Sequence, residues 1–268
     1  MLRKSSLVLC LFVTGCMSAA MKRPYASISD ASVSAALDAK NAYFVAEDAY
    51  NGEQADELVQ RYKDHGYTPG EITTFLSLKD MRARIEAVDV LGKYGERINF
   101  ILNPKFAATT QSKQGGSKSS SSKSSSSKSS GPFPFPKLTQ SEVNTAQQAI
   151  AYIGEALASI KTRRQLPKAV AKADPSIQVL CDLFIRDIDT LRAEVKESFE
   201  TRLILENDFI RDNWDDMDAL EHRSEIAKLP AIEKQARDAE DTLAKAQDEL
   251  KRVAEQSRKI AEEYHGKK

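Results

Sequence analysis

The sequence predicts an all-α protein, built as an elongated antiparallel helical bundle with a coiled-coil hairpin over residues 174–264. Apolar residues recur at alternating steps of three and four, a spacing that keeps one face of a helix against a partner helix. The composition is 41% hydrophobic and 29% charged with only 7% aromatic residues, which is typical of helical bundles rather than β proteins. We expect about five helices, grouped on either side of a serine-rich linker.

The second arm of the hairpin has the most regular pattern. Its apolar seam alternates between steps of four and three: Ile232, Ala236, Ala239, Leu243, Ala246, Leu250, Val253, Ser257, Ile260 and Tyr264. The residues between them are almost all charged or Gln, which suits a solvated opposite face. This apolar seam can be buried either by other helices of the same chain or by a second copy of the protein. In the second case the protein would be a homo-oligomer.

The first arm is expected to begin at Asp174-Pro175, an N-cap followed by proline in the first turn. Its seam is predicted at Ile177, Cys181, Phe184, Ile188, Leu191, Val195, Phe199, Leu203, Ile210, Asn213, Met217 and Leu220. A slip of about one position near Val195 is a stutter, which locally relaxes a left-handed supercoil. At 1.5 Å per residue, this arm would be about 70 Å long and the second about 50 Å. Pro230 is expected to break the pattern, with the turn between the arms at residues 224–229.

A first helix is expected over residues 30–65, ending at Gly66. Its predicted buried side consists of Val33, Leu37, Phe44, Leu58 and Tyr62. Asn51-Gly52 is a possible interruption. Residues 22–29 before it are expected to form a short tether.

A second helix should follow the capping box Thr68-Pro69-Gly70-Glu71 and stop at Asn103-Pro104. Its predicted apolar residues are Ile72, Phe75, Met81, Ile85, Val88, Ile98 and Leu102. Gly92 and Gly95 lie on one face of this helix. They indicate either a close helix crossing or a tolerated weak point.

Residues 105–137 differ from the rest of the chain because they are mostly serine, glycine, lysine and proline. This composition cannot bury apolar surface and predicts a disordered linker. Its lysines suit either a plain solvated linker or a basic tether that touches anionic lipid or wall polymers. Phe133 and Phe135, in an extended proline-rich segment, would dock on the bundle edge or form a partner-binding motif.

A third group of apolar residues follows the capping box Thr139-Gln140-Ser141-Glu142. Its members are Val143, Ala146, Ile150, Ile153, Leu157 and Ile160, and the pattern fades at Arg163-Arg164 before Pro167. The predicted organisation is a signal peptide at 1–15, a lipidated tether at 16–29, a helical hairpin at 30–104, the linker at 105–137 and a three-helix bundle at 138–268. Whether the hairpin packs on the bundle is left open.

The N-terminus has a basic start at Arg3 and Lys4 and an apolar run over residues 7–13. This run is too short to span a bilayer, which needs about 20 residues. It is followed by Val13-Thr14-Gly15-Cys16, which resembles the lipobox of bacterial lipoproteins. In that motif an apolar residue, a small residue and Gly or Ala precede an invariant Cys; the family prefers Leu where Val13 stands.

The resemblance implies cleavage before Cys16 and acylation of its thiol. Three acyl chains would be attached there, and two already suffice for stable membrane anchoring. Met17, with no Asp beside the lipidated cysteine, resembles the family's outer-membrane sorting pattern in Gram-negative cells, so the protein would face the periplasm. The alternative is an ordinary signal peptide cut near Ala19 and Ala20.

No arrangement of residues indicates catalysis, a metal or a cofactor. The histidines His65, His222 and His265 are scattered and each stands beside a predicted helix end, whereas a metal site needs clustered ligands. Ser120-x-x-Lys123 matches an acyltransferase motif only because Ser/Lys repeats generate such matches. Cys181 is the one cysteine left after processing and acylation, so no internal disulfide can form. We expect it to be a small core residue.

One acidic stretch is a candidate partner-binding site. Between residues 206 and 225 the acidic residues outnumber the arginines, and the only tryptophan, Trp214, lies among them with Asp212, Asp215, Asp216 and Asp218. Exposed aromatic residues among charges can anchor a partner. The binding interpretation predicts a basic partner or docking of the protein's own lysine linker. The alternative is a solvated helix end with Trp214 packed on a neighbouring helix.

The predicted function is that of a membrane-anchored, non-enzymatic scaffold, adaptor or exclusion-type lipoprotein that binds protein partners through its helix faces. Because 39 basic residues balance 39 acidic ones, no binding to nucleic acid is expected. A pore-forming or membrane-remodelling protein is the alternative, although Lys- and Glu-rich outer faces argue against it. An envelope hydrolase would need a catalytic constellation that the sequence does not contain.

Overall fold

The computed structural model describes residues 19–65, 76, 78–103, 140–160 and 162–266. These residues form the α-helices α1 (Ala19–His65), α2 (Leu78–Leu102), α4 (Gln140–Ser159), α5 (Leu166–Asp212) and α6 (Ala219–Gly266), with short 3₁₀ turns η1 (Arg163–Gln165) and η2 (Trp214–Asp216). They contain no strand, and the prediction of an all-α bundle with five helices is confirmed. The signal peptide, Cys16 and the linker at 105–137 lie outside the described residues.

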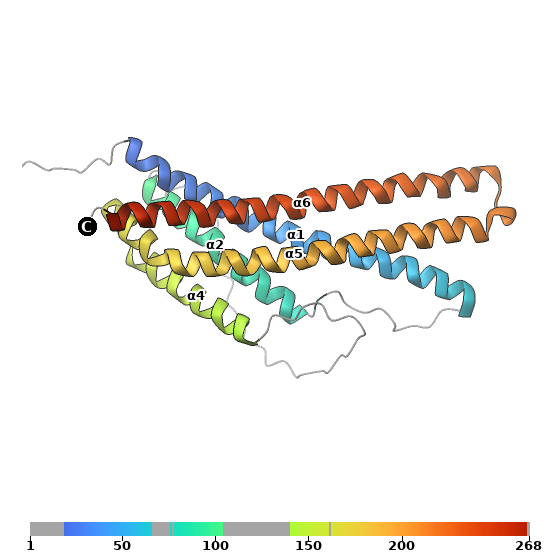
Figure 1. The fold of residues 1–268 in the computed structure, drawn as a ribbon, viewed down its shortest axis with the longest axis horizontal. Coiled ribbons are helices and arrows are strands. Elements are labelled where there is room, and N and C mark those ends of the chain that lie inside the picture. The colour runs from blue at the N-terminus through green and yellow to red at the C-terminus, as the bar shows by residue number, and fades with distance from the viewer. Residues whose placement is uncertain (1–18, 66–75, 77, 104–139, 161, 267–268) are drawn as a thin grey trace, which may run out of the picture.

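The bundle is elongated because α5 and α6 run antiparallel along most of its length (Figure 1). Helix α1 packs against both of them, and α2 packs on α1 while α4 packs on α5. One end of the bundle brings together the start of α1 and the end of α6; the opposite end is formed by the turn between α5 and α6 (Figure 1). The first two helices therefore pack on the later three.

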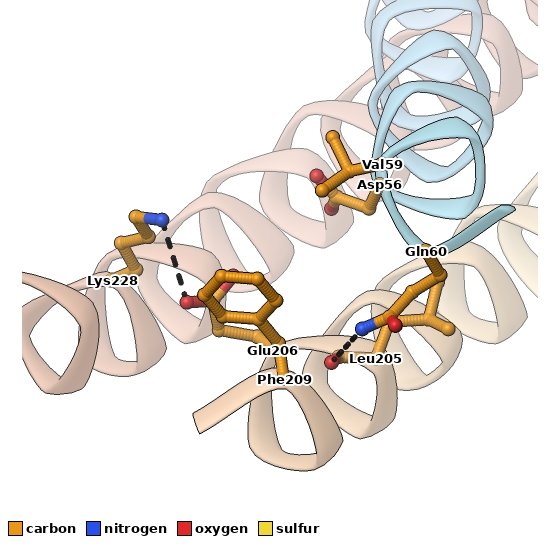
Figure 2. Close-up of a pocket in the computed structure, with 7 residues that line it drawn as sticks. All are labelled: Asp56, Val59, Gln60, Leu205, Glu206, Phe209 and Lys228. Carbon is orange, nitrogen blue, oxygen red and sulfur yellow. Dashed lines mark hydrogen bonds and ion pairs between the residues drawn. The ribbon is translucent and has the colours of Figure 1, made fainter. Parts of the chain in front are cut away.

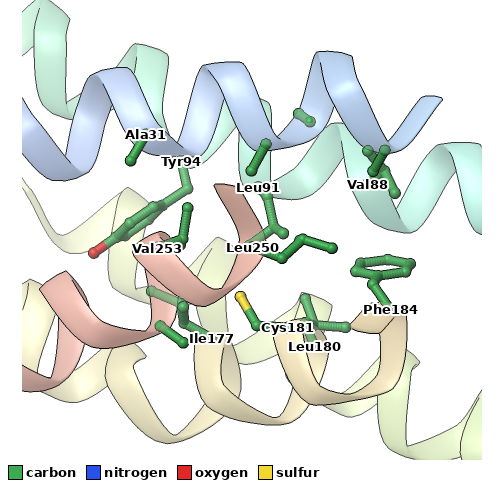
Figure 3. Packing of buried hydrophobic residues seen from close by; sticks show 14 of the residues in the cluster. Ala31, Val88, Leu91, Tyr94, Ile177, Leu180, Cys181, Phe184, Leu250 and Val253 are labelled. Atoms are coloured by element: carbon green, nitrogen blue, oxygen red, sulfur yellow. The ribbon is translucent and has the colours of Figure 1, made fainter. Parts of the chain in front are cut away.

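The core draws residues from every helix, and Figure 3 shows the part that α1, α2, α5 and α6 share. Ala31 of α1, Leu91 of α2 and Leu250 of α6 are fully buried around Leu180 and Cys181 of α5. The predicted seam of α6 is buried from Ile232 to Ile260 apart from a half-buried Ala236, and the chain's own helices α5 and α1 cover it. Cys181 is a small core residue, as predicted.

The turn of the long hairpin differs from the prediction. Helix α5 ends at Asp212 and α6 begins at Ala219, so the expected turn at residues 224–229 is helical and Leu220, predicted as a seam residue, is exposed. Asp218 explains why α6 begins here, because its carboxylate accepts hydrogen bonds from the backbone N–H groups of Leu220 and Glu221, at 2.7 and 2.9 Å. The Glu221 carboxylate accepts in turn from the Asp218 N–H, at 2.8 Å, which completes a capping box.

Two prolines expected at helix boundaries lie inside helices. Pro230 is within α6 and Pro175 is within α5, which begins at Leu166 rather than at Asp174. Both prolines are exposed. Proline removes one backbone hydrogen bond, and water can satisfy the freed carbonyl on an exposed face, so packing of the other face keeps the helix continuous.

The first helix also differs from the prediction. It begins at Ala19 and includes residues 22–29, which were expected to be a tether, because Tyr25, Ile28 and Ser29 are buried against the bundle. The predicted buried face is wrong: Val33, Leu37, Phe44 and Tyr62 are exposed. The core face is made instead of small residues, namely Ala31, Ala35, Ala39, Ala42, Ala46 and Ala49.

A close crossing of α1 and α2 explains why small residues are buried there. A Cβ added at Gly95 would lie 2.4 Å from the backbone oxygen of Ser29. The Ser29 hydroxyl donates a hydrogen bond to the Gly95 carbonyl over 2.7 Å. The close-crossing interpretation of Gly95 is therefore confirmed. At Gly92 an added Cβ would lie 3.2 Å from the Cβ of Ala36, which is also tight.

Candidate functional site at the α5–α6 turn

The candidate site is the turn that joins α5 to α6, together with the helix ends beside it; we call residues 206–225 the tip. Its backbone is fixed at both sides. The Asn213 side chain donates a hydrogen bond to the Phe209 carbonyl at 2.6 Å, which closes the end of α5. The capping box of Asp218 and Glu221 opens α6. Between these two caps, η2 carries Trp214, Asp215 and Asp216.

Trp214 is held in a defined position although 47% of its surface is exposed. Its ring stacks on the His222 ring with the centroids 3.9 Å apart and an angle of 19° between the planes. The His222 Nε2 atom hydrogen-bonds the Trp214 backbone carbonyl at 2.7 Å. One face of the indole therefore rests on α6, and the side chain still presents a large area to solvent.

The acidic residues of the tip fall into two groups. Some are neutralised or used as caps: Asp208 and Asp212 contact Arg211 at 2.8 and 3.1 Å, while Asp218 caps α6. Asp215 and Asp216 are exposed, and within the part of the chain that the structure describes they have no ion-pair partner. The charge that remains next to Trp214 is therefore negative.

Glu206, Glu225 and Lys228 form a cluster at the base of the tip. Lys228 of α6 forms ion pairs with Glu225 and, at 3.5 Å, with Glu206 of α5. Burial and the neighbouring Glu225 raise the pKa of Glu206 despite the attraction of Lys228. Burial alone would lower the pKa of Lys228, but the two carboxylates outweigh it and the pKa of Lys228 is raised. The cluster joins the arms of the hairpin just below the turn.

A shallow pocket lies beside this cluster, between α5, α6 and the end of α1 (Figure 2). Its lining consists of Asp56, Val59, Gln60, Leu205, Glu206, Phe209 and Lys228. The Gln60 amide donates a hydrogen bond to the Leu205 carbonyl at 3.2 Å, which ties α1 to α5 at this level. The volume is about 90 Å³, well below the roughly 300 Å³ at which small-molecule sites begin. The exposed surface of the tip is therefore a better candidate site than the pocket.

All five predicted binding residues of the tip, Asp212, Trp214, Asp215, Asp216 and Asp218, lie together at the turn. Asp218 is a helix cap and Asp212 contacts Arg211, so Trp214, Asp215 and Asp216 are the residues with surface left for a partner. The sequence analysis missed the support that His222 gives to Trp214. The Asp218-x-x-Glu221 spacing, a capping-box pattern, is the signal that could have placed the turn correctly.

A second polar cluster lies in the core, away from the tip. Arg84 of α2 binds Asp187 of α5 through two hydrogen bonds of 2.7 and 2.8 Å, and the Tyr43 hydroxyl of α1 donates to the same carboxylate at 2.7 Å. Burial would lower the pKa of Arg84, but Asp187 outweighs this effect and the pKa is raised. All three side chains are buried, so this cluster ties three helices together and has no access to a ligand.

The described segments meet the requirements neither of a metal site nor of a membrane-spanning helix. They contain no group of three or more His, Cys, Asp or Glu residues that could hold a metal ion. No described helix is long and apolar enough to cross a membrane. His65 and His265 lie in the last turns of α1 and α6, as expected from the sequence, whereas His222, expected near the end of the first arm, lies in the first turn of α6.

Comparison of the chain with protein-family models, with curated proteins and with solved structures found no match.

Proposed function

We propose that the protein is a lipid-anchored lipoprotein of the bacterial envelope that acts as a non-enzymatic helical adaptor and binds a basic protein segment through its tip. The observation that carries this proposal is the position of the tip. It lies at the end of the bundle opposite Ala19 (Figure 1), and Ala19 follows the predicted lipidated residue Cys16 by three positions. A lipid at Cys16 would therefore hold one end of the bundle and leave the tip pointing away.

The length of the hairpin sets the reach of the tip. Helix α5 has 47 residues, which at 1.5 Å per residue corresponds to about 70 Å. A protein anchored in the outer membrane, as Met17 beside Cys16 suggests, would hold its tip this far into the periplasm. Such a distance suits contact with a partner that is not in the same membrane.

The chemistry of the tip supports a basic partner. Asp215 and Asp216 are exposed without an ion pair among the described residues, and half of Trp214 is open to solvent. A lysine or arginine that approaches Asp215 or Asp216 can also lie over the indole face, where cation–π attraction adds about 0.5–1 kcal/mol at an exposed site. The same chemistry fits the lysines of residues 105–137, so the protein's own linker is a competing ligand.

The experiment that tests the proposal uses the only tryptophan of the chain as its reporter. Mature protein is titrated with a synthetic lysine-rich peptide while the emission of Trp214 is recorded. We expect a saturable change that weakens as salt is added, because exposed charges are screened. The titration is repeated on a chain that lacks residues 105–137, which should bind more tightly if the linker competes.

Matched variants distinguish binding at the tip from a general attraction of the peptide to acidic side chains. Asp215→Asn with Asp216→Asn should abolish the response, whereas Asp241→Asn with Glu262→Gln, which removes the same charge from exposed positions on α6, should keep it. An emission that does not change, or an equal loss in both double variants, would refute a binding role for the tip. Retention of the response in the tip variant would do the same.

A further inference from the structure

The end of the bundle opposite the tip is basic. We call it the foot; it comprises residues 19–26, 96–103, 155–160, 162–172 and 258–266, which gather at the end where the C-terminus lies (Figure 1). The foot contains nine Lys and Arg residues and four Asp and Glu residues. The tip, in contrast, contains eight Asp and Glu residues and two arginines. The overall balance of 39 basic and 39 acidic residues therefore conceals a separation of charge along the bundle.

Part of the positive charge of the foot is used by the fold. Arg163 of η1 donates hydrogen bonds to the carbonyls of Ile101 and Leu102, at 3.1 and 2.7 Å, and so ties the end of α2 to the start of α5. Lys172 of α5 forms an ion pair with Glu155 of α4 at 3.5 Å. These contacts hold the helix ends together, so the two side chains that make them have less charge left for a ligand.

Four other basic side chains of the foot are available to a ligand; we call them the basic patch. Lys22, Arg23, Arg164 and Lys168 have no ion pair among the described residues, and all are exposed except Lys22, which is half-buried. The segments that carry them, the first turns of α1 and the stretch from η1 into the first turns of α5, contain no acidic residue. A concentration of unpaired positive charge of this kind attracts a negatively charged surface.

We infer that the basic patch binds the headgroups of anionic lipids in the membrane that holds Cys16, as a second attachment beside the lipid anchor. In its choice of membrane the inference rests on the proposed function. Ala19, the first residue of α1, follows Cys16 by three positions, a span of at most about 10 Å. The Debye length at physiological ionic strength is about 8 Å. The foot therefore lies close enough to the membrane to be attracted by the negative charge of its surface.

The two ends of the bundle favour the same orientation. One acyl chain with a basic patch anchors a protein more firmly than the chain alone. Each Lys or Arg close to an anionic surface strengthens binding about fivefold. The exposed carboxylates of Asp215 and Asp216 at the tip would be repelled by the same surface. Attraction at the foot and repulsion at the tip would both hold the tip away from the membrane.

Sedimentation with lipid vesicles tests the inference on protein that begins at Met17, which keeps every described residue. The lysines of residues 105–137 are replaced by serine in every protein compared, so that the linker adds no charge. We expect sedimentation with vesicles of equal parts phosphatidylglycerol and phosphatidylcholine, none with phosphatidylcholine alone, and weaker binding as sodium chloride is added. Sodium phosphate of the same ionic strength should act like sodium chloride. Stronger competition by phosphate would indicate a phosphate site and overturn the inference.

Matched double variants locate the binding surface. Arg164→Gln with Lys168→Gln should weaken binding to the anionic vesicles about 25-fold, because two charges of the patch are lost. Lys234→Gln with Arg237→Gln removes the same charge from exposed positions on α6, far from the foot, and should weaken binding at most about twofold. All four residues are exposed, so the helical signal should be unchanged. Absence of binding by the parent, or equal weakening in both variants, would overturn the inference.

Failure of the patch is distinguishable from failure of the proposed function. The protein used in the vesicle assay lacks Cys16, so its binding does not depend on whether the chain is lipidated in cells. The response of Trp214 to the lysine peptide should be the same in both double variants, because neither changes the tip. Loss of vesicle binding with an intact Trp214 response would therefore count against the basic patch alone.

Discussion

At the scale of single residues, the buried ion pair between Arg84 and Asp187 should dominate stability. Their side chains are 1% and 5% exposed. Asp187→Ala would leave the guanidinium buried without its counter-charge, and breaking a buried pair in this way costs about 3–5 kcal/mol. The free energy of unfolding in urea measures this loss. Asp238→Ala, which removes an exposed partner of Lys234, should cost at most about 1 kcal/mol.

Replacing both members of this ion pair should recover stability. Replacing both partners with apolar residues, as in Arg84→Met with Asp187→Leu, removes the unpaired charge and should restore most of the stability lost by Asp187→Ala. The Tyr43 hydroxyl would lose its acceptor, so recovery should be incomplete. A double variant that is less stable than Asp187→Ala would contradict this account of the core.

The thiol of Cys181 should not react with labelling reagents while the protein is folded. Burial raises the pKa of its thiol to about 12, and only the thiolate reacts quickly. In protein lacking residues 1–16, Cys181 is the only cysteine, so thiol labelling at pH 8 should be negligible in buffer and complete in denaturant. Rapid labelling under native conditions would show that α5 and α6 separate far more often than their packing indicates.

Which single residues the sequence could predict depended on their type. Cys181 and the α6 seam are apolar at regular spacing, so their burial follows from the pattern. Arg84, four residues before Val88, and Asp187, directly before Ile188, also lie on the buried faces of their helices. Charged residues, however, are normally assigned to the solvated face. Their burial depends on a contact between two residues that are 103 positions apart in the chain and lie on different helices. The spacing within one helix cannot show such a contact.

At the scale of helices, the crossing of α1 and α2 should be sensitive to a single methyl group. Gly95→Ala would place a Cβ 2.4 Å from the Ser29 oxygen, and overpacking of this kind typically costs about 1–3 kcal/mol. Gly154→Ala is the matched control because no atom lies within 4 Å of its added Cβ, and it should stabilise α4 by about 0.5–1 kcal/mol. Chemical denaturation of both variants checks the opposite signs. Equal effects would argue against the close crossing.

The cap of α6 predicts a pH dependence at the tip. Hydrogen bonds from the Glu221 and Leu220 N–H groups lower the pKa of Asp218. Because the folded pKa lies below the unfolded one, the contribution of Asp218 is present above the ordinary carboxyl pKa of about 3.9 and is lost as the pH falls through the lowered pKa. The melting temperature of Asp218→Ala should thus be lower than that of the parent at neutral pH and converge with it in acid. A difference that does not depend on pH would exclude the charged cap.

The sequence predicted the number and type of helices better than their ends. Proline was expected to end a helix, yet Pro175 and Pro230 are exposed within continuous helices. The buried face of α1 was assigned wrongly because large apolar residues were assumed to be the buried ones. Three neighbouring helices approach α1 closely enough that alanines fill the space, and such distances arise only in the assembled bundle.

At the scale of the whole molecule, two features would act together: an anchor near the start of α1 and a tip at the far end of α5 and α6. The fold relates them because α1 runs beside the long hairpin and ends near the base of the tip (Figure 1).

The measurement that tests the central claim most directly is the fractionation of bacterial cells that express the full chain or its Cys16→Ser variant. The parent should be recovered in the membrane fraction with the added mass of a diacylglycerol and an acyl chain on the cleaved product. The variant lacks the thiol that accepts the lipid and should be found in the soluble fraction. A processed Cys16→Ser protein that remains firmly in the membrane fraction would contradict the claim that lipid on Cys16 anchors this bundle.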